Sequence, residues 1–470
     1  MTDLSPVIEI DVTEEASLPR KVVRRGPQVF LFLQGPISPF FSRLADALEA
    51  RGHRILRINL CFGDYLFWRR SGAVNYRGRA EGWQKFISDF LRREKVTDIV
   101  LLGEQRFYHK IAIAAARDLG ITVTVTDFGY LRPDWITLEL DGMSGQSRFP
   151  RDPVTIRALA RNRAKPSLEV KYTDSFRNQA VWDVVFHLSN TVFRAFYPYY
   201  RSYQLHHPIP AYIGTGIRLL LRRRRGVMAN RTIEELRIAK SPVFILPMQM
   251  ENDFQLRAYS RYPDMKAPIR EVVDSFAQHA SPDAHLVIKI HPLDPGLRLW
   301  KRFVRRCADA AGVAARVHYI DGGSLDELLG IAAGVVTINS TVGVWAMRFA
   351  CPVKTLGDAI FDIEGLTFQG PLDSFWTDAV PPDPALFSDF TTALANTIQI
   401  RGVYYSEDGV AAAVAAAVER LDPGFGATIE MRLTVPRGES VSSGSRRGAG
   451  ADLGRADIRS GPPWNVATAS

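Results

Sequence analysis

Residues 29–51 read VFLFLQGPISPFFSRLADALEAR, and this stretch decides the fold class. The apolar run at 29–33 predicts a fully buried strand, QGP at 34–36 predicts a turn, and residues 42–51 predict a helix. A buried strand, a glycine turn and a helix in that order open a βαβ unit.

The same alternation of strand and helix continues along both halves of the chain. Further strands are expected at 53–59, 97–102 and 122–126, and then at 243–246, 286–290, 317–320, 334–338 and 353–356. Continuously apolar strands that alternate with helices predict parallel sheets covered on both faces. The sequence therefore predicts an α/β protein with two doubly wound, Rossmann-like domains.

Composition places the domain boundaries, and 470 residues suffice for two hydrophobic cores. We expect a polar lead-in at 1–26, a first domain at 27–178, a helical connecting region at 179–240, a second domain at 241–430 and a disordered tail at 431–470. The connecting region is rich in aromatic residues and ends in the arginine run 222–225. Two interpretations stay open: a helix core with a solvated end, or a surface for a lipid-linked acceptor at an anionic membrane.

The net charge is +9, from 59 Lys and Arg against 50 Asp and Glu, which suits an acidic partner such as nucleic acid, an anionic membrane or an anionic substrate. The 3 cysteines are far apart and indicate neither a disulfide framework nor a zinc site. The N-terminus lacks the basic and apolar segments of a signal peptide. Glycines and polar residues interrupt the uncharged stretch 328–347, which favours a strand, a turn and a helix over a membrane span. We expect a soluble, cytoplasmic protein.

Polar residues follow three predicted strands of the second half, where ligands bind in open parallel sheets. They are the segment 247–253 (PMQMEND), His291 with Pro292, and Asn339 with Ser340 and Thr341. Ser340 and Thr341 begin a predicted helix, whose free N–H groups and positive dipole end suit a donor phosphate. The alternatives are that Ser340 or Thr341 only caps the helix and that His291 is structural.

The absence of an Asp-x-Asp pair from the predicted loops indicates the class of sugar donor. Nucleoside diphosphate sugars are often held through a metal bound by an Asp-x-Asp pair, and no such pair stands in a suitable loop. A nucleoside monophosphate sugar has one phosphate, which a histidine and a helix start can neutralise without metal. We therefore expect a CMP-sugar donor, no metal and no further cofactor.

The first half offers a second set of polar residues after its strands. The segment 127–139 (DFGYLRPDWITLE) carries Asp127, Arg132 and Glu139, although it also fits a structural turn. The other candidates at this edge are Gln34, Asp64, Arg106 and His109, each equally compatible with a cap or turn.

With these residues in view, the sequence resembles the capsule polysaccharide biosynthesis and export family, and within it the KpsS/LipB type of Kdo transferase. The resemblance rests on FLQGPISPFFSRLADAL, RINLCFGDYLFW, LLGEQRFYH, DFGYLRPDWITLELDG, LPMQMENDFQLR, IKIHPLD and TINSTVG, in that order. The resemblance spans about residues 29–343.

The resemblance implies a GT-B fold with two Rossmann-like domains facing a central cleft, and a retaining β-Kdo transferase that uses CMP-Kdo. It implies a lysophosphatidylglycerol-type acceptor and peripheral contact with the inner face of the bacterial inner membrane and with a capsule assembly and export complex. Its motif residues correspond here to Asp127, Gln249 with Asp253, His291 with Pro292, and Ser340. Asp127 departs from the family's usual glutamate, which leaves the acid/base assignment open.

On this basis Asp253 is the predicted nucleophile and Asp127 the predicted proton-transfer group. Arg132 or Arg106 is expected to bind the Kdo carboxylate, with Glu139, His109, Gln34 and Asp64 as further acceptor-side candidates. Two rival functions stay open: a GT-B transferase for a UDP- or GDP-sugar, and a non-catalytic capsule assembly or polysaccharide-binding protein. Nucleic-acid binding is not expected, because the basic residues are dispersed and no recognition module is present.

Overall fold

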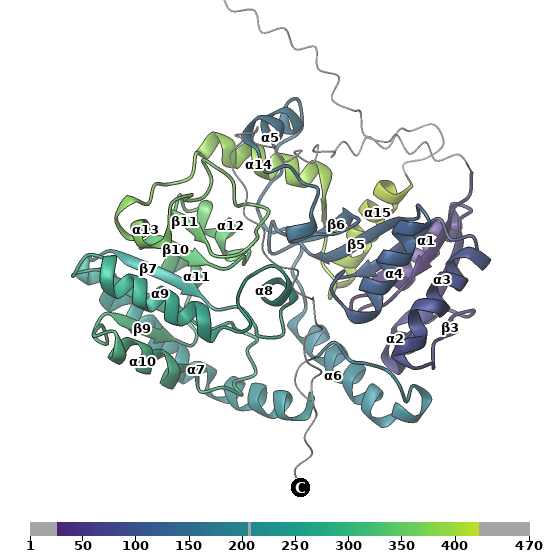
Figure 1. Ribbon diagram of the computed structural model, residues 1–470, viewed down its shortest axis with the longest axis horizontal. Helices are drawn as coiled ribbons and strands as arrows, with labels where there is room; N and C mark the ends of the chain where they lie inside the picture. Colours follow the sequence, from purple (N-terminus) through teal and green to yellow (C-terminus); the bar gives the residue numbers. More distant parts are fainter. Residues whose placement is uncertain (1–25, 205–207, 423–470) are drawn as a thin grey trace, which may run out of the picture. The chain divides into compact units, whose positions relative to one another are not determined.

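A computed structural model describes residues 26–204 and 208–422, and it contains two β-sheets with covering helices (Figure 1). The expected tail at 431–470 lies outside the described residues. So does the expected lead-in at 1–26, apart from residue 26. The expected α/β class with mostly parallel sheets is confirmed.

The first sheet has the strand order β12-β6-β5-β4-β1-β2-β3. Its strands are β1 (Val29–Phe32), β2 (Arg54–Asn59), β3 (Val74–Asn75), β4 (Asp98–Leu102), β5 (Thr122–Phe128), β6 (Trp135–Leu140) and β12 (Gln399–Arg401). The helices of this half are α1 (Phe40–Ala50), α2 (Phe62–Trp68), η1 (Ala80–Gly82), α3 (Trp83–Arg93), α4 (Phe107–Asp118), η2 (Ser144–Gln146) and α5 (Pro153–Ala160).

The second sheet has the order β11-β10-β7-β8-β9, and all its strands are parallel. Its strands are β7 (Val243–Pro247), β8 (His285–Lys289), β9 (Val317–Ile320), β10 (Ala332–Thr337) and β11 (Val353–Thr355). The helices that follow β7 are α8 (Phe254–Ala258), α9 (Lys266–His279), α10 (Trp300–Ala310), α11 (Leu325–Leu329), α12 (Val342–Met347), α13 (Leu372–Asp378), α14 (Pro384–Thr397) and α15 (Glu407–Leu421).

Both sheets share one topology in their parallel parts. In chain order within each half, the fifth, fourth, first, second and third strands lie side by side. The chain therefore reverses its direction of winding between β1 and β4 in the first sheet and between β7 and β10 in the second. Ligands bind at such switch points, beyond the carboxyl ends of the strands.

The edge of the first sheet departs from the expected parallel pattern. β6 pairs antiparallel with β5, and β12 pairs antiparallel with β6. β12 lies far from β6 in sequence, within the segment expected to belong to the second domain, and α15 packs beside α1 (Figure 1). The C-terminal end of the predicted second domain thus completes the first sheet, because β6 offers an unpaired edge that β12 covers.

The connecting region forms the helices α6 (Phe176–Val192), η3 (Arg194–Phe196) and α7 (Pro208–Ala239). The uncharged stretch 328–347 forms the end of α11, the strand β10 and the helix α12, as expected. Among the described residues, no helix combines the length and apolar character needed to span a bilayer.

Candidate active site

The switch point of the second sheet is closed by a reciprocal pair of amide side chains. Gln249, just after β7, donates from Nε2 to Asn339 Oδ1 at 2.9 Å and accepts the backbone N–H of Asn339 at 3.3 Å. Asn339 Nδ2 in turn donates to the Gln255 carbonyl at 2.8 Å. Since both side chains are buried, these bonds fix the residues that follow β7 and β10 relative to each other.

Asp253 caps the short helix α8 beside this pair. One of its carboxylate oxygens accepts the backbone N–H of Gln255 at 2.8 Å. Burial raises the pKa of Asp253 to about 6, and the negative charge of Asp127 adds to this rise. The Gln255 N–H, the Arg132 guanidinium and the Gln249 side chain lower the pKa. Asp253 is therefore mostly ionised at neutral pH.

Asp127 is the second-last residue of strand β5, and its carboxylate accepts the backbone N–H of Phe128 at 2.7 Å. Burial raises its pKa, and Arg132 and Arg106 lower it. The Arg132 guanidinium also lies over the Phe128 ring, 4.8 Å from the ring centroid. Arg132 is thus the cation that acts on both predicted catalytic carboxylates.

Gly129 leaves room at this turn for two neighbouring oxygen atoms. A side-chain Cβ at this position would stand 2.5 Å from the Trp135 carbonyl oxygen and 2.6 Å from Gln399 Oε1. The Gly129 N–H donates to that Trp135 carbonyl at 2.8 Å, and the Tyr130 N–H donates to Gln399 Oε1 at 2.8 Å. Gln399 of β12 thereby holds the turn that carries Asp127 and Arg132.

His291 is half-buried at the end of strand β8. Its Nδ1 accepts the backbone N–H of Leu293 at 3.1 Å, so in the neutral ring the proton is on Nε2. Burial lowers the pKa of His291 to about 4, with contributions from Arg132 and Arg218. At neutral pH His291 is therefore an uncharged hydrogen-bond donor through Nε2.

Arg218 of helix α7 holds the loop that follows His291. Its guanidinium donates to the carbonyl oxygens of His291 at 3.4 Å and of Asp294, and it pairs with Asp321 at 2.5 Å. Arg225, two helical turns beyond Arg218 on the same face of α7, pairs with the other oxygen of Asp321 at 2.6 Å. The last arginine of the 222–225 run thus faces the protein.

Ser340 and Thr341 precede helix α12, and both are half-buried. The Ser340 hydroxyl accepts the Val342 N–H at 3.3 Å, while the Ser340 N–H donates to the Thr337 hydroxyl at 3.2 Å. Thr341 is the N-cap residue and makes no side-chain cap bond. Neither hydroxyl therefore makes a side-chain N-cap bond to α12, and phosphate binding by either residue stays a prediction.

The switch point of the first sheet carries Gln34 after β1 and Glu104 after β4. Arg106 donates to Gln34 Oε1 at 2.9 Å. The Tyr259 hydroxyl donates to Glu104, and Gln105 donates to that hydroxyl at 2.7 Å. Tyr259, which no sequence motif indicated, links the segment after α8 to the first sheet.

Three acceptor-side candidates have structural roles in the fold. Asp64 is the N3 residue of a capping box at the start of α2 and pairs with Arg57 at 3.3 Å. His109 is buried in α4, where Nδ1 bonds the Gly103 carbonyl at 2.8 Å and burial lowers its pKa to about 3. Glu139 is buried in β6, where burial raises its pKa to about 8 and Ser147 donates to it. Pro292, by contrast, is exposed.

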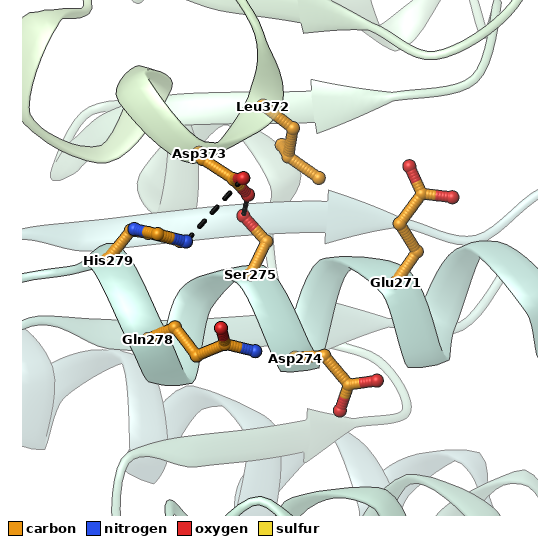
Figure 2. Close-up of a pocket in the computed structure, with 7 residues that line it drawn as sticks. All are labelled: Glu271, Asp274, Ser275, Gln278, His279, Leu372 and Asp373. Carbon is orange, nitrogen blue, oxygen red and sulfur yellow. Dashed lines mark hydrogen bonds and ion pairs between the residues drawn. The ribbon is translucent and has the colours of Figure 1, made fainter.

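A pocket between α9 and α13 contains Ser275, His279 and Asp373, but its geometry is not that of a catalytic triad (Figure 2). Ser275 and His279 both contact the same carboxylate, Asp373, at 2.6 Å and 3.5 Å. The Ser275 hydroxyl also accepts the Trp376 indole N–H at 2.8 Å. The serine proton is directed to Asp373, and His279 contacts that carboxylate and not the serine, so the three residues do not form a Ser-His-Asp relay. Within 26–204 and 208–422 there is also no group of His, Cys, Asp and Glu arranged to hold a metal ion.

A model of the family described as capsule polysaccharide biosynthesis protein matches residues 97–405. This range contains the strands β4 and β10 and the segments that carry Asp127, Asp253 and His291. The chain belongs to this family. Among curated relatives, the capsule polysaccharide export protein KpsS of Escherichia coli is 32% identical over 390 residues, covering 80% of this chain and 96% of the relative. The capsule polysaccharide modification protein LipB of Neisseria meningitidis serogroup A is 33% identical over 401 residues, covering 80% of this chain and 91% of the relative.

Solved structures with detectable similarity include two β-Kdo transferases of Thermosulfurimonas dismutans KpsC. The 2,7 transferase is 14% identical, with a TM-score of 0.40 and coverage of 84% of this chain and 100% of that chain. The 2,4 transferase is 13% identical, with a TM-score of 0.37 and coverage of 81% and 93%.

Proposed function

We propose that this capsule polysaccharide biosynthesis protein is a retaining β-Kdo glycosyltransferase that transfers Kdo from CMP-Kdo to a lysophosphatidylglycerol-type lipid. The observation that carries the proposal is the joint action of Arg132 on the pKa of Asp127 and of Asp253. Two carboxylates, Asp127 in β5 and Asp253 at the start of α8, one of them with a pKa of about 6, suit a double displacement at a sugar carbon.

In the first step, the Asp253 carboxylate attacks C2 of Kdo as the bond between C2 and the phosphate oxygen breaks. CMP leaves with the electron pair, and its phosphate accepts a hydrogen bond from His291 Nε2. Arg132 pairs with the Kdo carboxylate and so orients the sugar for attack at C2. Ser340 and Thr341 are the further proposed phosphate contacts.

In the second step, the acceptor hydroxyl attacks C2 while Asp127 takes its proton. The C2 bond to Asp253 breaks and the carboxylate is regenerated, so configuration at C2 is retained over the two displacements. Burial suits Asp127 to this role because it raises the carboxylate's affinity for a proton. No metal and no other cofactor take part in the scheme.

The proposed setting is the inner face of the bacterial inner membrane, where the acceptor lipid is found. The protein would lie there peripherally, in contact with a capsule assembly and export complex. Because the proposed acceptor is an anionic lipid, this setting also accounts for the positive net charge.

A transfer assay tests the proposal. Purified protein with CMP-Kdo and lysophosphatidylglycerol is expected to release CMP and to yield a Kdo-lipid of the corresponding mass, with the β configuration by NMR. Turnover of a UDP- or GDP-sugar in place of CMP-Kdo would overturn the donor assignment. Tight binding of capsule polymer without any transfer would favour the non-catalytic scaffold.

A further inference from the structure

Helix α7 has one face that packs against the protein. Ala229, Ile233 and Leu236 are buried, and Arg218 and Arg225 both pair with Asp321. At 100° per residue, these five side chains project into one sector of about 80°. This sector is the face by which α7 is attached to the second sheet, next to β9.

The opposite face of α7 is apolar and exposed to solvent. Ile213, Ile217, Leu220 and Val227 recur at intervals of three, four and seven residues, which places them on one side of the helix. Their exposed fractions are 61%, 52%, 86% and 70%. A stripe of four large aliphatic side chains this exposed is unusual on a soluble protein and indicates a surface that contacts something apolar.

Between residues 208 and 233 the charged residues of α7 are all arginines. Arg222, Arg223 and Arg224 are exposed, and the chain contains no Asp or Glu between residues 208 and 233. The helical period places Arg224 within the stripe and Arg223 about 40° beyond one of its borders. Their long aliphatic stems can lie along an apolar layer while the guanidinium groups reach phosphate oxygens.

Helix α6 carries a similar exposed stripe formed by Val181, Leu188 and Val192. The Tyr212 hydroxyl of α7 donates to the Asp183 carboxylate of α6 at 2.7 Å, which joins the two helices (Figure 1). The exposed apolar area is therefore not confined to one helix.

We propose that the exposed face of α7 docks on an anionic phospholipid bilayer, with the stripe Ile213, Ile217, Leu220 and Val227 at the level of the acyl chains and Arg223 and Arg224 on lipid phosphates. This inference rests on the proposed function, since it supplies the surface on which a lipid acceptor is met, and it deepens that function by naming the partner of α7. A second copy of the chain fits the face less well, because a symmetric contact would bring two acid-free arginine runs together.

In this arrangement one face of α7 would contact the bilayer and the other would contact the loop of the proposed donor site. The face opposite the stripe holds, through Arg218, the carbonyl oxygens of His291 and Asp294. A helix seated on the membrane would therefore set the position of the His291 loop above the lipid surface.

Vesicle co-sedimentation of the full chain tests the docking surface. The probes are vesicles of phosphatidylcholine alone and vesicles of equal parts phosphatidylcholine and phosphatidylglycerol. We expect binding to the second kind, about tenfold weaker or more in Arg223→Gln/Arg224→Gln and in Leu220→Glu. The matched controls are Arg161→Gln/Arg163→Gln and Val154→Glu, which alter equally exposed residues elsewhere. Unchanged melting temperatures establish that the variants are folded.

Equal binding of wild type and Leu220→Glu, or an equal loss in the control variants, would overturn the docking surface. So would a wild-type dimer in solution that Leu220→Glu converts to a monomer without change in vesicle binding. Vesicle binding of the predicted kind without Kdo transfer would refute only the proposed function. Transfer to a water-soluble acceptor analogue without vesicle binding would refute only the docking surface.

Discussion

Arg132 is the residue on which the proposed chemistry depends most. It stands on the turn after β5. It lowers the pKa of Asp127, near the end of β5, and of Asp253, which caps α8. Two separate sequence segments contain these three residues, and only the structure shows that Arg132 acts on both carboxylates. The residue scale therefore gives the first two predictions.

The pH dependence of transfer reports the ionisation of Asp253. Because the attacking group is the carboxylate and its pKa is about 6, kcat/KM is expected to rise with pH through about 6 and then level off. Arg132→Gln removes a cation that lowers this pKa, so the rise should move to higher pH by about one unit. Arg257→Gln, an exposed change on α8, serves as the control. An unmoved rise in Arg132→Gln would contradict the assignment.

Glu139 offers a test of burial that does not depend on the reaction. Its pKa is about 8 in the folded protein against an ordinary value of 4.5, so the folded state binds the proton more tightly than the unfolded state. Stability is therefore lost as pH rises from about 4.5 to about 8. Glu139→Gln should be more stable than wild type at pH 7 by about 1 to 3 kcal/mol, with no such difference near pH 4.

Thermal and urea unfolding at both pH values measure the effect of Glu139→Gln. The exposed Glu81→Gln is the matched control, for which no pH-dependent difference is expected. A variant that is less stable than wild type at pH 7 would show that the Glu139 carboxylate is ionised and paired.

At the scale of elements, long periodic segments were predictable and short ones were not. The helix expected at 42–51 and the strands expected at 97–102 and 317–320 match α1, β4 and β9 within two residues. The five-residue helix α8 was missed because it has less than two turns of periodic pattern, although it carries Asp253. Only the structure shows that Asp253 is a helix cap as well as a candidate nucleophile.

Arg218 connects helix α7 to the loop after β8 through hydrogen bonds. Arg218→Gln removes the pair with Asp321 and the bonds to the His291 loop. If His291 contacts the donor phosphate, KM for CMP-Kdo should rise about three- to tenfold with kcat little changed, because a loosened loop mainly weakens binding. Steady-state kinetics with CMP-Kdo measure this.

Arg237→Gln provides the comparison for Arg218→Gln. Arg237 lies on the same helix but pairs with Glu234 at 2.9 Å on an exposed surface, so its loss should leave KM unchanged. An equal rise of KM in both variants would mean that Arg218 acts only through the stability of α7.

At the scale of the whole molecule, residues 399–421 return to the first sheet. Sequence rhythm alone assigned residues 399–421 to the second domain, because a three-residue strand carries no information about its partner. The structure pairs β12 with β6 and places Gln399 against Gly129. The proton-transfer candidate Asp127 is therefore supported by a segment more than 250 residues away in sequence.

Tyr404 is the anchor of this returning segment. It is buried, its ring meets those of Phe40 and Phe128 with centroids 5.4 Å apart, and its hydroxyl donates to the Asp127 carbonyl at 3.3 Å. Tyr404→Ala should cost about 3 to 5 kcal/mol of unfolding free energy, whereas Tyr404→Phe should cost about 1 kcal/mol. Urea unfolding measures both, with the exposed Tyr65→Ala as the control. Equal losses in Tyr404→Ala and Tyr65→Ala would contradict the anchoring role.

Metal-free release of CMP from CMP-Kdo, measured with lysophosphatidylglycerol and EDTA present, tests the central claim most directly. Wild type and Asp118→Asn, an exposed change on α4, are predicted to release CMP at the same rate. Asp253→Asn is predicted to lose at least about a thousandfold in rate, because the attacking carboxylate is gone. A near wild-type rate in Asp253→Asn, or release that requires a divalent metal, would contradict the account.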